Sequence, residues 1–315
     1  MNRGIAGAAG GAAAVALALS VPPPLPASGT GSVAASIAPL ADIVRKVAGD
    51  DLPVHELFPP GVNPMAAVPS REALRELTAG VLYVRVGSVL EGNADSLVAE
   101  AAGGDLAVLD LSRGVDLIGP SIPEAAEDRI YSAALGLDDG GTGRGDNPFL
   151  WLDPLLVREF VDDLASALSE VRPTRRAEFE KRAAALTEGL EELDRGIRER
   201  LRDIRGKPFA TFSGAPSYFC RRYGLKEVPV TGVTPGGGPG RQSLKGTVSR
   251  LQRLGVGAVF SDPSFPRRPA ETAAGRAGVR LLVLEPFGAP GRGGYFEMMG
   301  HTLDLIEEGL RSSPQ

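Results

Sequence analysis

The sequence is poor in the residues that cross-link small proteins or bind metals. It contains a single cysteine, Cys220, and only two histidines, His55 and His301, among 315 residues. One cysteine excludes an intramolecular disulfide and any CxxC metal or redox motif. The mature protein must therefore be stabilised by the packing of its core alone.

The sequence also lacks an excess of positive charge. It carries 34 basic and 39 acidic residues, for a net charge of −5. A protein that binds nucleic acid usually presents a basic surface, so no nucleic-acid partner is expected. Hydrophobic residues make up 43% of the chain, which is enough for a packed core, and the length suggests about two domains.

The N-terminus has the pattern of a secretory signal peptide. Arg3 is followed by an uncharged run of small and apolar residues at 5–21, then by prolines and by Ala27. This pattern predicts export and removal of residues 1–27, and the alternative is retention of the run as a membrane anchor. No cysteine stands at the exit, so we do not expect a lipoprotein. No later segment is apolar enough to span a bilayer.

Short apolar runs rich in β-forming residues alternate with stretches long enough for helices. This alternation predicts parallel α/β sheets, and near-continuous apolar runs are typical of strands covered on both faces. Four runs in each half predict two similar lobes, at residues 32–152 and 206–312, each with a four-stranded parallel sheet and flanking helices. The predicted strands are 33–37, 54–58, 81–86, 106–111, 209–212, 227–230, 258–260 and 280–284.

Residues 153–205, between the two lobes, have a helical pattern. Asp153 and Pro154 are a typical N-cap and first residue, and Pro173 interrupts the helix that they begin. From residue 174 to residue 205 a single apolar stripe, which starts at Phe179 and ends at Ile204, repeats at helical spacing. This predicts one long helix that joins the two lobes and limits their relative movement.

Motifs for catalysis or phosphate binding are incomplete. The glycine-rich run at 234–240 lacks the lysine and spacing of a P-loop, and Ser213 lacks the glycine that a nucleophile elbow needs at position 211. His55 lies in the middle of a predicted strand, and His301 lies on the polar face of the C-terminal helix. We therefore expect no catalytic residues and no enzyme activity.

Several segments, in order and at similar spacing, resemble the metal-binding subunits of zinc and manganese ABC importers. The sequence FPPGVNP resembles that family's PPG-x-x-P-H loop, and NPFLWLDP resembles its D-P-H-x-W-L-D-P segment. GKPFATFS resembles G-K-x-F-x-x-x-H, YFCRRYGL resembles Y-F-x-x-R-Y-G-L, and AVFSDPSF resembles A-V-F-x-E-P-Q-F. These segments, together with ASIAPLADIV, lie at residues 58–64, 147–154, 206–213, 218–225, 258–265 and 35–44.

The resemblance implies a fold, a location and a partner. Members of this family have two α/β lobes joined by one long helix, and they bind zinc or manganese in the cleft between the lobes. They work outside the cytoplasm and deliver metal to the membrane permease of an ABC importer. We expect the same scaffold here, as a monomer.

The family's metal-ligand positions are substituted in this chain. The resemblance places the three histidines at Met65, Phe149 and Ser213, and the final carboxylate at Pro266, four residues past Asp262. Zinc requires about four nitrogen, sulfur or oxygen ligands, and a phenyl ring supplies none. A thioether suits Cu(I) better than zinc or manganese. We therefore predict a degenerate metal site, no confident cofactor, and a cleft lined by Met65, Phe149, Ser213 and Asp262.

Two hypotheses remain open at this point. In the first, the cleft captures a solute other than the usual metal ion, or binds metal only weakly. In the second, the chain is an envelope interaction protein that kept the scaffold and no longer transports anything. Convergent polar groups in the cleft would favour the first hypothesis, and a cleft filled by Phe149 would favour the second.

Overall fold

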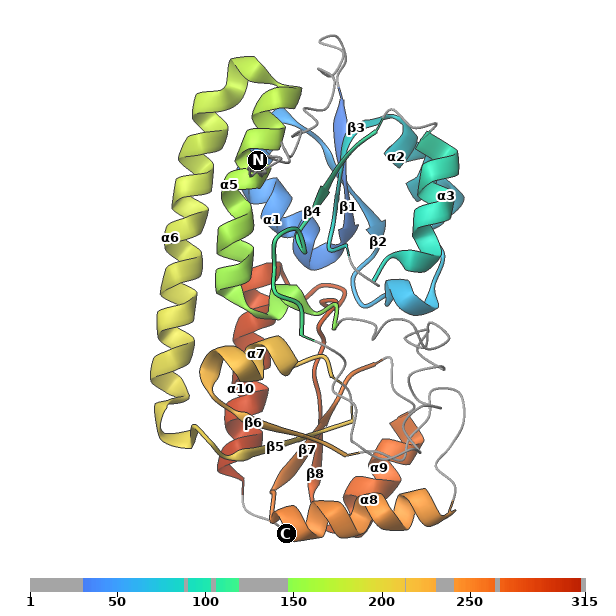
Figure 1. Cartoon of the computed structure of the whole chain (residues 1–315), viewed down its shortest axis with the longest axis vertical. Helices are drawn as coiled ribbons and strands as arrows, with labels where there is room; N and C mark the ends of the chain where they lie inside the picture. Colours follow the sequence, from blue (N-terminus) through green and yellow to red (C-terminus); the bar gives the residue numbers. More distant parts are fainter. Residues whose placement is uncertain are drawn as a thin grey trace, which may run out of the picture.

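The fold consists of two α/β lobes stacked end to end (Figure 1). The computed structural model describes residues 31–87, 90–102, 106–118, 147–212, 214–230, 241–263 and 267–312. The predicted signal peptide, the acidic segment 119–146, residues 231–240 with the glycine-rich run 234–240, Ser213 and Pro266 lie outside these residues. Within the described ranges, no helix combines the length and apolar character needed to cross a membrane.

The N-terminal lobe contains one four-stranded parallel sheet with the strand order β2-β1-β3-β4. Every residue of the central strand β1 is buried, which fits its sequence of small and apolar residues. The elements are β1 (Ser32–Ile37), α1 (Ala38–Ala48), β2 (Val54–Phe58), α2 (Arg71–Thr78), β3 (Gly80–Arg85), α3 (Gly92–Ala102) and β4 (Ala107–Asp110).

The C-terminal lobe repeats this topology with the strand order β6-β5-β7-β8, again parallel throughout. The elements are β5 (Pro208–Thr211), α7 (Ser217–Tyr223), β6 (Lys226–Pro229), α8 (Arg241–Leu254), β7 (Ala258–Ser261), α9 (Arg267–Ala277), β8 (Arg280–Val283) and α10 (Tyr295–Arg311). All eight predicted strands and the two-lobed architecture are therefore confirmed.

One detail of the strand prediction was wrong. The sequence indicated that every strand is covered on both faces, but Val108 in β4 is 50% exposed and Val283 in β8 is 37% exposed. Both strands lie at the edge of their sheet, where the covering helices reach less of the surface. An apolar run alone does not distinguish an edge strand from a central one.

Two consecutive helices, α5 and α6, lie between the two sheets along the chain. Asp153 begins α5 (Pro154–Val171) as predicted, since its Oδ1 accepts a hydrogen bond from Leu155 N at 3.0 Å. A 3₁₀ turn at Pro173–Arg175 separates α5 from α6 (Arg176–Arg200). A second 3₁₀ turn, Arg202–Ile204, ends the long helix, so the regular part is shorter than the predicted 174–205.

Helix α6 is about 37 Å long at 1.5 Å per residue and runs beside both lobes (Figure 1). Near its start, Arg182 donates to Ala48 O at 2.9 Å and pairs with Asp51 at 2.8 Å in the N-terminal lobe. Near its end, the guanidinium of Arg198 lies 5.8 Å from the ring centroid of Tyr223 in the C-terminal lobe. The predicted role of this helix as a link is confirmed.

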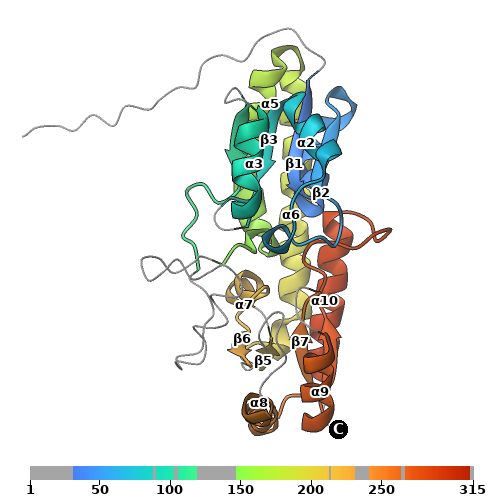
Figure 2. The same ribbon diagram turned by 90° about the vertical axis from the view of Figure 1, so that its right-hand side faces the viewer.

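The C-terminal helix α10 is a second link, which the sequence did not predict. Figure 2 shows α10 running lengthwise beside α6. At its first residue, Tyr295 N donates to Asp42 Oδ2 of α1 at 2.8 Å. At its other end Gly309 lies so close to β7 that an added Cβ would be 2.5 Å from a ring carbon of Phe260. The helix therefore packs against both lobes.

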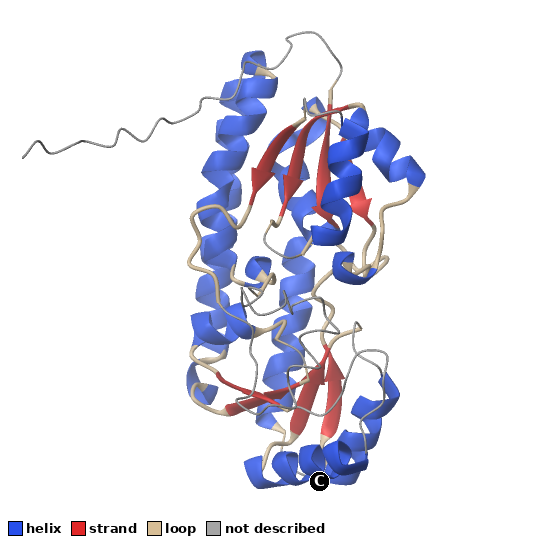
Figure 3. Ribbon diagram, turned by 45° about the vertical axis from the view of Figure 1, so that its right-hand side comes forward, coloured by secondary structure: helices blue, strands red, loops and turns tan. Residues whose placement is uncertain are grey.

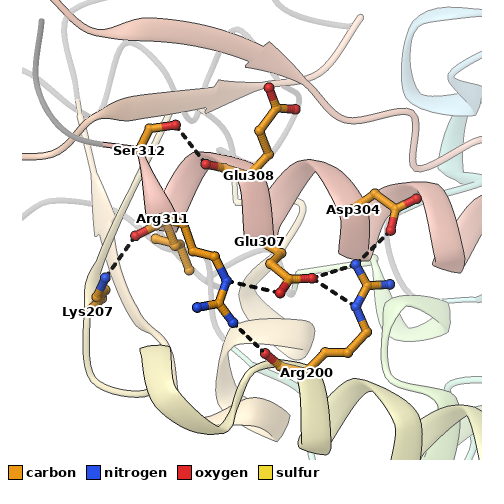
Figure 4. A network of polar contacts seen from close by, with 8 residues as sticks. Arg200, Lys207, Asp304, Glu307, Glu308, Arg311 and Ser312 are labelled. Atoms are coloured by element: carbon orange, nitrogen blue, oxygen red, sulfur yellow. Dashed lines mark hydrogen bonds and ion pairs between the residues drawn. The ribbon is translucent and has the colours of Figure 1, made fainter.

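A polar network joins the ends of α6 and α10 (Figure 4). Arg200 binds Asp304 at 2.7 Å and, through Nε, Glu307 at 2.8 Å. Arg311 Nε also donates to Glu307, at 3.0 Å. These hydrogen bonds, chiefly those from Arg200, lower the pKa of the Glu307 carboxyl group. Because these groups lie at the surface, the network orients the two helices more than it stabilises the fold.

A buried carboxylate holds the chain where β3 ends. Glu91 is 0% exposed, and its two oxygens accept hydrogen bonds from Val86 N at 2.9 Å and Gly87 N at 3.0 Å. Gly87 has a φ of 81°, a conformation that suits glycine and turns both amides toward one carboxylate. Burial raises the pKa of Glu91 to about 7, and the two amide hydrogen bonds oppose that rise.

Replacement of Asp42 by alanine tests the link between α10 and the N-terminal lobe. Loss of the acceptor for Tyr295 N should lower the free energy of unfolding by about 1 kcal/mol, as for other helix caps. Urea denaturation followed by circular dichroism measures this. Lys46→Ala is the control, because it removes the Lys46–Asp42 ion pair (3.5 Å) and keeps the cap. Equal destabilisation by both substitutions would contradict the capping role.

The stability of the protein should depend on pH through Glu91. Between about pH 4.5, where the unfolded carboxyl group ionises, and about pH 7, the native state keeps its proton while the unfolded state loses it. Wild-type stability should therefore fall with rising pH in this window, relative to Glu91→Gln, by on the order of 3 kcal/mol. Urea titrations at several pH values measure the difference. Glu100→Gln, at an exposed site on α3, should follow the wild type; parallel curves for wild type and Glu91→Gln would refute the assignment.

Candidate functional site

The strands of the two sheets point toward the middle of the molecule, so their carboxyl ends face each other (Figure 3). In an open α/β sheet, ligands bind outside the carboxyl ends, at the point where the strand order reverses. That point lies between β1 and β3 in one lobe and between β5 and β7 in the other. The region between the lobes is therefore the candidate site.

Met65 is held in the loop that follows β2. It lies in a 3₁₀ turn, Pro64–Ala66, in which Met65 N donates to Asn63 Oδ1 at 3.0 Å. The Met65 side chain is partly buried and packs against the main hydrophobic core. Its thioether is a soft, weak acceptor, so this position offers a poor ligand for zinc or manganese.

Phe149 packs inside an aromatic cluster at the junction of the lobes. Its ring centroid lies 5.3 Å from that of Trp151 and 5.7 Å from that of Phe287, and the residue is only 6% exposed. Trp151 Nε1 donates to Pro286 O at 2.7 Å, and Tyr295 Oη donates to Trp151 O at 2.7 Å. Because Phe287 follows β8 and Phe149 precedes α5, this cluster joins the two halves of the chain.

Asp262 lies where the strand order of the C-terminal sheet reverses. It directly follows β7 and is 2% exposed. A carboxylate at this position can hold a cation or accept hydrogen bonds from a solute. Ser213 and Pro266, the other expected site residues of this lobe, lie outside the described residues, so the structure does not test their proximity to Asp262.

Glu285 is a second carboxylate at this edge, and sequence reasoning missed it. It follows β8 after one residue, with a side chain that is 28% exposed. Its Oε2 lies 3.6 Å from Arg292 Nε and 3.9 Å from His301 Nε2. The sequence did contain a signal for this residue: Glu285 directly follows the predicted strand 280–284, and the sites of α/β proteins form at the carboxyl ends of strands.

Glu285, Arg292 and His301 line a pocket beside α10. The pocket has a volume of about 480 Å³ and is bounded by the loop between β8 and α10, including Gly288, and by the first turns of α10, including Met298. His301, predicted to lie at the surface, is 37% exposed and faces this loop. The pocket combines acidic, basic and imidazole groups in one place.

A second pocket, of about 460 Å³, lies where α5, α6 and α7 meet. Three arginines and three acids line it, and the strongest of its ion pairs joins Arg222 Nε to both oxygens of Asp153, at 2.8 Å each. Arg198 pairs with Asp194 at 2.7 Å. These ion pairs balance half of the six charges that line the pocket, and they join α5 to α7 and neighbouring turns of α6.

The described residues do not present a full metal-binding group. Among them, no set of three or more His, Cys, Asp or Glu side chains lies close enough together to hold a metal ion. His55 lies in the edge strand β2, where its Nδ1 stands 3.2 Å from Glu76 Oε2. Cys220 is buried, and burial raises the pKa of its thiol well above the usual value.

Two named bacterial proteins are similar in sequence to this chain over part of their length. The high-affinity zinc uptake system protein ZnuA of Brucella abortus is 34% identical over 139 residues, which are 44% of this chain and 42% of that protein. The zinc-binding lipoprotein AdcA of Streptococcus pneumoniae is 25% identical over 267 residues, which are 82% of this chain and 50% of AdcA. The chain thus spans about half the length, or less, of these relatives.

Solved structures share the fold. A crystal structure of ZnuA matches with a TM-score of 0.73 and 22% identity, covering 89% of this chain and 99% of that one. Zn(II)-bound AdcA from Streptococcus pneumoniae matches with a TM-score of 0.71 and 21% identity, covering 91% of this chain and 59% of that one.

The family model for the periplasmic zinc-uptake complex component A, ZnuA, matches residues 33–309, nearly the whole described chain. The length of this match and the shared two-lobed fold confirm the resemblance that the sequence motifs indicated. The chain therefore belongs to the ZnuA family of periplasmic solute-binding proteins that serve zinc ABC importers.

Proposed function

We propose that this chain is the solute-binding subunit of an ABC importer in which the family's metal site is degenerate or serves another solute. The observation that carries the proposal is the position of Phe149. A residue that the sequence motif aligns with a metal-binding histidine is here a phenyl ring packed against Trp151 and Phe287.

The donor chemistry supports this proposal. Tetrahedral zinc needs about four donors at roughly 2.0–2.3 Å. Phe149 supplies none, Met65 supplies a thioether, and the two carboxylates, Asp262 and Glu285, come from the same lobe. Bringing a divalent ion against Phe149 without enough compensating negative charge would be costly. Zinc or manganese binding should therefore be weak.

The same features indicate what kind of solute the cleft would accept. Met65 and Phe149 make the N-terminal side of the cleft more apolar than histidines at these two positions would. Asp262 and Glu285 leave acidic groups on the opposite side. A small solute with an apolar part and a cationic or hydrogen-bond-donating part fits this combination, and the protein would have no catalytic role.

Family membership supports a proposal for location and partners. We propose that residues 1–27 direct export and are removed, and that the mature monomer works in the periplasm or an equivalent extracytoplasmic space. Its partner would be the membrane permease of an ABC importer. AdcA of Streptococcus pneumoniae is named a lipoprotein, whereas the signal region here contains no cysteine.

A second candidate function is a non-transport role in the envelope, on the same scaffold. The packing that buries Phe149 favours it, because a cleft filled by aromatic rings has less room for a solute. Native mass spectrometry of protein purified from the periplasm separates the two proposals. A co-purified small molecule supports solute binding, and a consistently empty protein supports the interaction role.

Zinc and manganese titrations of the mature protein by calorimetry test the main proposal. Affinity should be orders of magnitude weaker than a four-ligand site gives, because each missing donor must be replaced by water. The double variant Met65→Ala, Asp262→Ala serves as the control and should bind no more weakly than the wild type. Nanomolar zinc binding at one site that this variant abolishes would disprove the proposal.

The reverse substitution tests whether the scaffold still has the geometry for metal. Combined Met65→His, Phe149→His and Ser213→His should raise zinc affinity by orders of magnitude, since three imidazoles join the carboxylates of the C-terminal lobe. The matched control, Met65→Leu with Phe149→Leu and Ser213→Ala, removes the same side chains and adds no donor. A folded histidine variant that binds zinc no better than this control would show that the geometry itself has been lost.

A further inference from the structure

The loop between β8 and α10 brings three ionisable side chains into one cluster. Glu285 begins the loop, Arg292 lies near its end, and His301 lies two turns into α10. Arg292 Nη1 is 2.9 Å from His301 Nε2, and Arg292 Nε is 3.6 Å from Glu285 Oε2. The guanidinium therefore contacts both of the other groups, and the three line the same pocket.

The direction of these contacts is set by arginine. A guanidinium carries N–H donors and no acceptor, and it stays charged at every pH at which the protein is folded. His301 must therefore accept through Nε2. Glu285 Oε2, at 3.6 Å from Arg292 Nε, is held by the attraction of opposite charges. The two acceptor atoms that face each other across the pocket are turned toward one permanent positive charge.

The same two atoms are of the kind that bind transition metals. An imidazole nitrogen and a carboxylate oxygen bind zinc at about 2.0–2.2 Å, and His301 Nε2 and Glu285 Oε2 lie 3.9 Å apart. One ion placed between them could reach both. The guanidinium of Arg292 approaches the same two atoms that such an ion would use.

We propose that Arg292 is a specificity-determining residue that keeps divalent metal ions out of this pocket by placing its own cation against Glu285 and His301. This inference rests on the proposed function, in which the chain no longer uses zinc or manganese as its solute. It adds that the chain supplies a positive charge where a carboxylate and an imidazole would otherwise attract a metal ion.

The neighbouring charges agree with this role. Glu297, the other acid of the pocket, is engaged at the start of α10, where its Oε2 accepts a hydrogen bond from Gly294 N at 3.2 Å. Among the described residues that line the pocket, Arg292 is the only arginine or lysine, and two acids, Glu285 and Glu297, line the same pocket. The two acids and Arg292 together carry a net charge of −1, and removal of Arg292 would make it −2 and leave two unblocked metal-binding atoms.

Zinc titration of an Arg292→Ala variant tests the proposal. Its side chain is 55% exposed, so the substitution should leave the fold intact, which thermal unfolding checks. Zinc affinity should rise by about ten-fold or more over the wild type, as expected when a like charge about 4 Å from the ion is removed. Arg292→Gln, which keeps a polar side chain without the charge, should give the same gain and replaces the alanine variant if that one unfolds.

Two further variants identify the cause. Arg292→Lys keeps the positive charge and should bind zinc as weakly as the wild type. Arg292→Ala combined with His301→Ala should lose the gain. Unchanged zinc affinity in a folded Arg292→Ala protein, or a gain that survives loss of His301, would overturn the proposal. Tight zinc binding by the wild type that depends on Met65 and Asp262 would instead overturn the proposed function, so the two failures are distinguishable.

Discussion

The structure depends on one continuous hydrophobic core that crosses from one lobe to the other. Buried residues of β1 and α1 belong to the same cluster as those of α5, α6, α7 and α10, and this cluster also reaches Phe209 and Phe260 in the second sheet. With a single cysteine and therefore no internal disulfide, apolar packing must hold the lobes in place. Helices α6 and α10 each contribute to both ends of this core, so a hinge that opened the lobes widely would expose it.

This constraint explains why an aromatic cluster occupies the junction of the lobes. Large rings bury much apolar area, and offset or tilted pairs at these distances add to the stabilisation. Phe149, Trp151 and Phe287 come from both sides of the junction, and Gly61 N donates to Phe287 O at 3.1 Å, which ties the loop after β2 to the same point. A histidine at position 149 would bring a polar group into this packing, whereas phenylalanine strengthens it. Scaffold stability and metal binding are thus opposed at this residue.

The sequence was sufficient to predict the strands, the two lobes and the long helix, because each depends on a local pattern of apolar residues. It was not sufficient for features that join distant segments. Asp42 and Tyr295 are 253 positions apart, and nothing in either helix pattern indicates that one caps the other. His301 lies on the polar side of its helix, as the helical spacing indicated. The loop between β8 and α10, which brings Glu285 and Arg292 against His301, has no regular spacing of apolar residues from which its path could be predicted. The candidate site was predicted only as far as the motifs extend, which is why Met65, Phe149 and Asp262 were named and Glu285 was not.

Phe149 and the Glu285–Arg292 pair would weaken metal binding in different ways. Phe149 carries a side chain that cannot bind an ion at all. At Glu285 a carboxylate is present, but the guanidinium of Arg292 balances its charge from within the protein. A cation that is covalently part of the chain loses only side-chain freedom when it is held in place, whereas a free ion must lose both its hydration and its translational freedom. The core residues that hold the lobes together are distinct from Glu285, Arg292 and His301, so the charges of these three groups can vary without loss of the core packing. The family scaffold can therefore persist while the chemistry at the strand ends changes.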